Sequence, residues 1–98
     1  MKKQLDDIKA IINSYKNELM IEHKIKAISI FGSYARGEQG EKSDIDLLAE
    51  FDGPISLLDL VGAEQYLSEI LKIKVDLIPK TNVRPELREI IFKEAIPV

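Results

Sequence analysis

Two aspartates one residue apart, Asp44 and Asp46, open an apolar run and are the residues of this chain best suited to chemistry. Alternate residues of a β-strand share a face, so the spacing predicts that both carboxylates point the same way, with Cα atoms about 7 Å apart. Carboxylate oxygens directed at one point suit a hard cation such as Mg²⁺. Without a second motif, the pair would be interpreted as two exposed aspartates at the start of a strand.

A Gly-Ser pair, Gly32 and Ser33, ends the preceding apolar run and supplies that second motif. A Gly-Ser turn between a strand and a helix offers backbone N–H groups and a hydroxyl to a phosphate, and glycine lets the backbone approach closely. Together with the aspartates, the turn predicts a site for a metal and a triphosphate. Arg36 follows one helical turn after Ser33, where it could reach the triphosphate or instead pair with Glu38 or Glu41.

A third aspartate, Asp76, lies inside a later apolar run, Val-Asp-Leu-Ile. We expect this run to form a buried strand, in which an unpaired carboxylate would cost several kcal/mol or have a raised pKa. A cation shared with the other aspartates would be a partner, and the carboxylate could then accept the proton of an acceptor hydroxyl. The plainer interpretation is an aspartate on an edge strand that points to solvent.

The three motifs in this order resemble the signature of the polymerase-β-type nucleotidyltransferase superfamily: Gly32-Ser33, Asp44-Ile45-Asp46 and Val75-Asp76-Leu77. The fuller strings over residues 32–37 and 43–48 resemble the minimal nucleotidyltransferases in particular, small proteins often paired with a helical HEPN-type toxin. The resemblance implies that Asp44, Asp46 and Asp76 are the catalytic metal ligands, which would hold two Mg²⁺ ions in the two-metal scheme. It also implies a nucleotide site formed by Gly32, Ser33 and Arg36.

The function implied by this resemblance is antitoxin activity. The protein would transfer AMP from ATP to a hydroxyl, a tyrosine, of a cognate HEPN-type toxin with which it forms a complex. One alternative is transfer to a small molecule, as in the aminoglycoside nucleotidyltransferases, which carry a further domain for the acceptor. Another is an antitoxin that acts by binding alone. The net charge of −3 argues against a general nucleic-acid-binding surface, and no direct nucleic-acid or membrane partner is expected.

The elements that must position these residues follow from hydrophobic periodicity. The pattern predicts helices over about the first twenty residues, over 33–36, over 56–71 and from Pro85 onward, and strands over 25–31, 44–51 and 73–78. Ser56 and Asp59 form a variant of the capping box. This order predicts an α/β (α+β) protein with a small β-sheet flanked by helices. The resemblance adds that the sheet is mixed and that the site lies at one edge.

The composition is that of an ordinary globular protein. With 98 residues, 45% of them hydrophobic, the chain is expected to form a single domain. The resemblance implies that this is a minimal nucleotidyltransferase domain over residues 1–98. No cysteine is present, which excludes disulfides and thiolate metal sites. Neither an apolar run of about 20 residues nor a signal-like N-terminus is found, so we expect a cytoplasmic protein.

Overall fold

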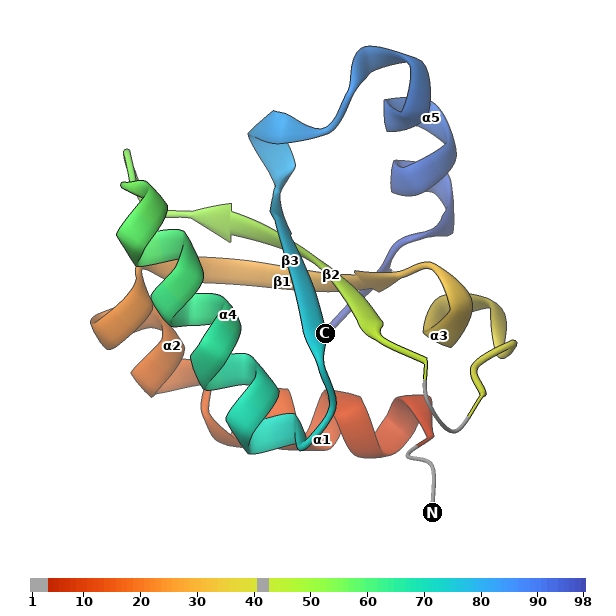
Figure 1. Ribbon diagram of the computed structural model, residues 1–98, viewed down its shortest axis with the longest axis horizontal. Helices are drawn as coiled ribbons and strands as arrows, with labels where there is room; N and C mark the ends of the chain where they lie inside the picture. The colour runs from red at the N-terminus through yellow and green to blue at the C-terminus, as the bar shows by residue number, and fades with distance from the viewer. Residues whose placement is uncertain (1–3, 41–42) are drawn as a thin grey trace.

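The computed structural model describes residues 4–40 and 43–98 as a four-stranded sheet with helices on both faces (Figure 1). In chain order the elements are α1 (Leu5–Ser14), α2 (Lys16–His23), β1 (Ile25–Phe31), α3 (Ser33–Arg36), β2 (Ile45–Phe51), α4 (Leu57–Leu71), β3 (Val75–Pro79), the 3₁₀ helix η1 (Lys80–Asn82), α5 (Pro85–Glu94) and β4 (Ile96–Pro97). The strand order is β3-β2-β1-β4, with β2 parallel to β3 and the other pairs antiparallel. The predicted mixed sheet flanked by helices is confirmed.

Helix α4 is the crossover that makes a parallel pair of β2 and β3 possible, because parallel strands need a long connection. It begins with the predicted capping box: Asp59 N–H donates to the Ser56 hydroxyl at 3.1 Å, and Ser56 N–H donates to the Asp59 carboxylate at 2.9 Å. At its other end, Lys72 adopts a left-handed conformation with φ 56° and ends the helix.

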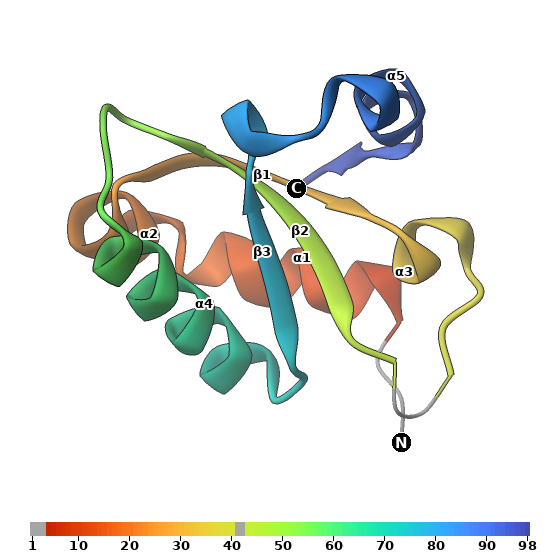
Figure 2. The ribbon, with the colours of Figure 1, turned by 45° about the horizontal axis from the view of Figure 1, so that its top comes forward.

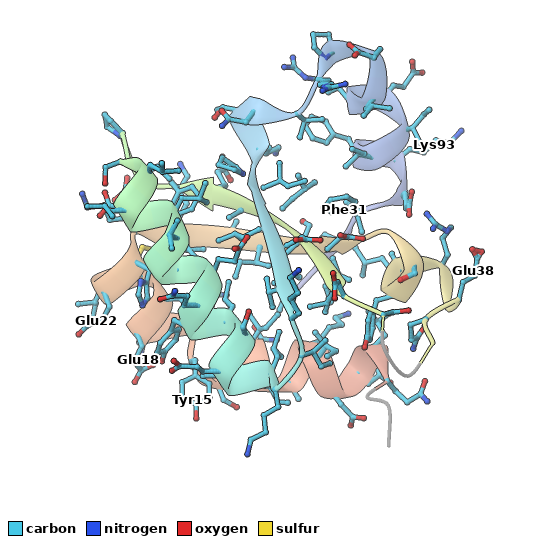
Figure 3. All side chains as sticks on the ribbon, viewed as in Figure 1. Tyr15, Glu18, Glu22, Phe31, Glu38 and Lys93 are labelled. Atoms are coloured by element: carbon cyan, nitrogen blue, oxygen red, sulfur yellow. The ribbon has the colours of Figure 1, made fainter. Side chains whose placement is uncertain are left out.

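The two faces of the sheet carry cores of very different size. Helices α1, α2 and α4 cover one face, and α5 lies on the other (Figure 2). The main core fills the first face and includes the alternating residues Ile45, Leu47 and Ala49 of β2. A small cluster of Phe31, Leu48 and Val83 packs against Ile91 of α5 on the other face. Figure 3 labels Phe31 of this cluster. Strand alternation therefore places Asp46 on the α5 face, opposite the main core, as predicted.

The helices differ from the predicted pattern in three places. The predicted first helix is interrupted at Tyr15, so that α1 and α2 are separate helices. In α4 the periodicity predicts a buried stripe that includes Leu57 and Leu67, and this is partly wrong: Leu57 is 75% exposed, whereas Ala63 is buried beside Leu67. In α5 the periodicity predicts an apolar side that includes Ile90, and this side is mostly uncovered, since Ile90 is 63% exposed. Within residues 4–40 and 43–98, no helix combines the length and the apolar character needed to cross a membrane.

Strand β3 lies at the edge of the sheet, and two side chains of α4 accept hydrogen bonds from its backbone. The carboxylate of Glu64 accepts the Leu77 N–H at 2.9 Å, and the hydroxyl of Ser68 accepts the Val75 N–H at 3.1 Å. The strand is buried at Val75 and Leu77, as expected, but Asp76 itself is exposed on this edge strand, which is the plainer of the two interpretations of the sequence. Apolar neighbours in sequence did not reveal this, since they face the cores on either side of the sheet.

Candidate active site

The pairing of β2 with β3 brings two of the predicted aspartates together. Asp46 and Asp76 are direct partners in the parallel register, so their Cα atoms are about 5 Å apart across the sheet and their side chains share the α5 face. Asp46 is partly buried and Asp76 is exposed. Asp44 immediately precedes β2, and its carboxylate lies 3.9 Å from Lys74 Nζ. That ion pair is solvent-exposed and therefore weak.

Gly32 sits directly against Asp46. Its predecessor Phe31 is the partner of Asp46 in the antiparallel register of β1 and β2. Gly32 has φ 74° and ψ −150°, a conformation that is essentially restricted to glycine. A Cβ built at this position would collide with Oδ2 of Asp46. The glycine is thus required both by the turn and by the carboxylate packed against it.

The residues after Gly32 form the short helix α3, which Gly37 ends as predicted. Ser33 is the first residue of this helix, and within residues 4–40 and 43–98 its hydroxyl forms no hydrogen bond. The sequence left open whether Tyr34 stacks on a base or packs in the core. Tyr34 is 3% exposed and belongs to the main core, so in this structure it packs.

Arg36 projects from the end of α3 and is held by two carboxylates. Its Nε donates to Glu38 at 2.9 Å, one of the two pairings considered from the sequence, and its Nη1 donates to Glu94 at 2.6 Å. The other residue considered, Glu41, lies outside the described residues. Figure 3 shows Glu38 beside α3, on the outer side of the molecule.

Glu94 is the site residue that sequence reasoning missed. It is the last residue of α5, and besides Arg36 its Oε1 accepts the backbone N–H of Gly32 at 2.9 Å. The two hydrogen-bonded residues are 62 positions apart in the chain. No local pattern marks Glu94, because only the packing of α5 on the sheet brings it to the turn.

The site is electrostatically strained. Burial raises the pKa of Asp46 above its ordinary value of 3.8, and the neighbouring charges of Asp76 and Asp44 raise it further. The positive charge of Arg36 lowers the pKa of Asp46, and the negative charge of Glu94 raises it by a smaller amount. A cation placed among these carboxylates would relieve their mutual repulsion.

The residues present fit a hard cation and a phosphate. Among residues 4–40 and 43–98, no three acidic or histidine side chains lie close enough to hold one metal ion, since Asp44 turns to Lys74 and only Asp46 and Asp76 are paired. The donor set is nevertheless all carboxylate oxygen, the kind of ligand that Mg²⁺ takes. The Gly32 N–H already holds an anionic oxygen, that of Glu94, and so can hold a phosphate oxygen.

The raised pKa of Asp46 leads to a prediction about stability. Because its pKa is higher in the folded than in the unfolded protein, Asp46 disfavours folding increasingly as pH rises from the unfolded value of 3.8 through the folded value. We expect Asp46→Asn, without Mg²⁺ or nucleotide, to raise Tm near pH 7, with a smaller gain near pH 4. Thermal unfolding at both pH values tests this. Asp52→Asn, in an exposed turn, is the charge-matched control, and an equal gain at both pH values would contradict the prediction.

A mixed sheet that presents paired aspartates beside a Gly-Ser turn fits a cation and a phosphorylated ligand, and comparison with known proteins identifies the class of protein. Residues 12–98 match the model of the nucleotidyltransferase domain family. A candidate protein adenylyltransferase of Methanocaldococcus jannaschii is 50% identical over 95 residues, which cover 96% of this chain and 97% of that protein. The protein adenylyltransferase MntA of Thermococcus cleftensis is 35% identical, with 96% of this chain and 95% of that protein covered.

Solved structures of other proteins share the fold of this chain. A candidate minimal nucleotidyltransferase superposes with a TM-score of 0.80 at 35% identity, covering 98% of this chain and 97% of that chain. The fold is also shared with a chain of a toxin–antitoxin complex solved with AMP-PNP, with a TM-score of 0.70, 24% identity and coverage of 83% of this chain and 67% of that chain. The chain belongs to the nucleotidyltransferase domain family. It is a nucleotidyltransferase, as the sequence motifs predicted.

Proposed function

We propose that this protein transfers AMP from ATP to a hydroxyl of a partner protein. The observation that carries the proposal is the position of Asp46, which is paired with Asp76 on one side and packed against Gly32 on the other. Carboxylates for a cation and a backbone N–H for a phosphate therefore meet at one point. Nucleotidyl transfer requires this combination of ligands.

The residues divide into donor-binding and metal-binding groups. The Gly32 N–H, the Ser33 hydroxyl and the Arg36 guanidinium would hold the triphosphate of ATP, and Asp44, Asp46 and Asp76 would hold Mg²⁺. When bound, Mg²⁺ neutralises the phosphates and lowers the pKa of an attacking hydroxyl. The exposed ion pair between Asp44 and Lys74 is weak enough to open for this purpose.

The reaction is a substitution at the α-phosphorus. The acceptor oxygen forms a bond to the α-phosphorus, the bond from that phosphorus to the bridging oxygen of the β-phosphate breaks, and pyrophosphate leaves. The acceptor hydroxyl loses its proton, and Asp76 is the carboxylate we assign to receive it. Because Asp76 is exposed on an edge strand, a hydroxyl carried by another macromolecule can reach it.

The comparisons and the sequence motifs support a protein as the acceptor. Two relatives are named for adenylyl transfer to proteins, and a chain of this fold occurs in a toxin–antitoxin complex. We therefore propose that the acceptor is a tyrosine of a cognate HEPN-type toxin, which AMP transfer neutralises, and that the reaction takes place in the cytoplasm. A folded partner brings its own binding surface, and the orientation it provides can supply several kcal/mol of the rate enhancement.

The test is intact-mass spectrometry of the partner. A small helical protein encoded beside this one, with an Arg-x₄₋₆-His motif, should gain one or more AMP units after incubation with the protein, ATP and Mg²⁺. The gain should be absent without Mg²⁺ and with Asp46→Ala, although that variant should still bind the partner, because docking and metal ligation would use different residues.

Two results would contradict the proposal. An unmodified partner together with efficient adenylylation of an aminoglycoside or another small alcohol would favour a small-molecule transferase. A partner that is neutralised equally well by Asp46→Ala, with no AMP transferred by either protein, would favour an antitoxin that acts by binding alone.

A further inference from the structure

The carboxylate of Glu94 accepts hydrogen bonds from Gly32 and Arg36, two of the groups that the proposed function assigns to the nucleotide. A single oxygen, Oε1, accepts the Gly32 N–H at 2.9 Å and the Arg36 Nη1 at 2.6 Å. The side chain of Glu94 is only 18% exposed, so this carboxylate is largely removed from solvent. Its charged partner Arg36 compensates for this burial, and hydrogen bonds between charged groups are the strong ones.

The carboxylate of Glu94 is repelled by Asp46, and it lies where the proposed function places an anionic triphosphate. Glu94 adds a third negative charge near Asp46, after those of Asp76 and Asp44, and that charge contributes to the raised pKa of Asp46. An acidic side chain here does not assist the binding of an anionic triphosphate by charge. What Glu94 does provide is an anionic oxygen for the Gly32 N–H and for Arg36 while no phosphate is present, since a buried N–H left unpaired would be destabilising.

A phosphate and Glu94 cannot both be held in this way. One backbone N–H makes one strong hydrogen bond, and the Gly32 N–H is taken by Oε1 of Glu94, which also accepts from Nη1 of Arg36. The second contact of Arg36, from Nε to Glu38, is on the exposed side and does not compete. A triphosphate oxygen at the Gly32 N–H must therefore replace the Glu94 carboxylate there, whereas Arg36 has further N–H groups to offer.

We propose that Glu94 is an internal competitor of the nucleotide: its carboxylate occupies the phosphate position on Gly32 and Arg36 and is displaced when the triphosphate of ATP binds. This inference rests on the proposed function, because it takes Gly32 and Arg36 as triphosphate ligands. Displacement frees the last residue of α5, which leads directly into β4 (Ile96–Pro97). Nucleotide binding is thereby coupled to the C-terminal end of α5.

The test is calorimetric titration of the protein with AMP-PNP and Mg²⁺. Glu94→Gln keeps the size of the side chain but removes its charge, which weakens its hold on Arg36 and on the Gly32 N–H. We expect this variant to bind AMP-PNP about tenfold more tightly, equivalent to about 1.4 kcal/mol. Glu89→Gln is the matched control, since it makes the same charge change at an exposed position of the same helix. It should bind within about twofold of the unmodified protein, an effect expected of screened surface charges.

Equal or weaker binding by Glu94→Gln would overturn the proposal and make Glu94 a residue that positions Arg36 for the nucleotide. A second measurement needs no variant and so does not depend on how the substitution folds. In NMR spectra of the unmodified protein, AMP-PNP with Mg²⁺ should shift both the Gly32 amide and the Glu94 side-chain carboxylate. Binding without a change at Glu94 would overturn displacement.

These measurements need neither an acceptor nor turnover, which separates the inference from the proposed function. If AMP-PNP binds and Glu94→Gln binds it no better, the competition is wrong while the proposed function stands. If the unmodified protein and Glu94→Gln both fail to bind AMP-PNP with Mg²⁺, ATP is not the donor and both proposals fail together.

Discussion

Replacement of Asp46 by alanine is expected to reduce AMP transfer at least about a thousandfold, because preorganised groups that stabilise transferred phosphate are worth factors of this size or more. Asp46 is the point at which the three parts of the site meet, since it pairs with Asp76, lies two residues from Asp44 and contacts Gly32. Its loss would remove a proposed metal ligand and the residue that connects the other two aspartates to Gly32. The rate of AMP transfer to the partner, measured with labelled ATP, tests this.

The matched control is Glu50→Ala. Glu50 is an acidic residue four positions further along β2, on the same face, and its exposed ion pair with Lys26 at 3.9 Å contributes little. Its replacement should leave transfer within about twofold of the unmodified rate, a change typical of substitutions away from a site. Full activity of Asp46→Ala would falsify the candidate site, whatever the control showed. Unfolding of Asp46→Ala is not expected, because the change relieves repulsion between carboxylates.

Gly32→Ala is expected to have the second largest effect, on activity and stability together. The residue would have to hold φ 74° and ψ −150°, which costs about 1–3 kcal/mol for a side chain other than glycine. Its Cβ would also displace the carboxylate of Asp46. We expect AMP transfer to fall about a hundredfold, as small displacements of catalytic groups can do, and thermal unfolding to show a lower Tm.

Gly53→Ala separates the effect of backbone strain from the effect of displacing the Asp46 carboxylate. Gly53 also has a positive φ, 97°, but nothing lies within 4 Å of a Cβ built there, and it sits in the turn after β2. Its replacement should lower Tm through backbone strain without lowering the rate of transfer. If Gly32→Ala lost no more activity than Gly53→Ala, the contact between Gly32 and Asp46 would have no role in the reaction.

Much of the fold could be predicted because the signals are local. The alternation of Ile45, Leu47 and Ala49 with Asp46 fixed the faces of β2, and the Ser56–Asp59 capping box fixed the start of α4. Gly32, Ser33 and the three aspartates could be proposed from the sequence because each lies in a strand or next to the end of one. What the structure adds is their arrangement: Asp46 beside Asp76, with Asp44 turned toward Lys74.

The features that were missed depend on packing. In α4 apolar residues occur on several faces, so the buried side, centred on Ala63 and Leu67, could not be chosen from the pattern. Strand β4 has two residues, too few to show an alternation. The choice between a buried and an exposed Asp76 depends on strand order, and the contact of Glu94 with Gly32 depends on α5 folding back over the sheet. None of these is encoded in the spacing of neighbouring residues.

The hydrogen bonds from α4 to β3 restrict how a partner can approach. The outward N–H groups of Val75 and Leu77 are already taken by Ser68 and Glu64, so another strand cannot join the sheet beside Asp76 without breaking both bonds. A partner that offers a hydroxyl to Asp76 must therefore present it from a loop, a chain end or a helix that crosses the open face of the sheet. Its recognition would rest on side chains, and mutation of its acceptor residue alone should leave docking intact.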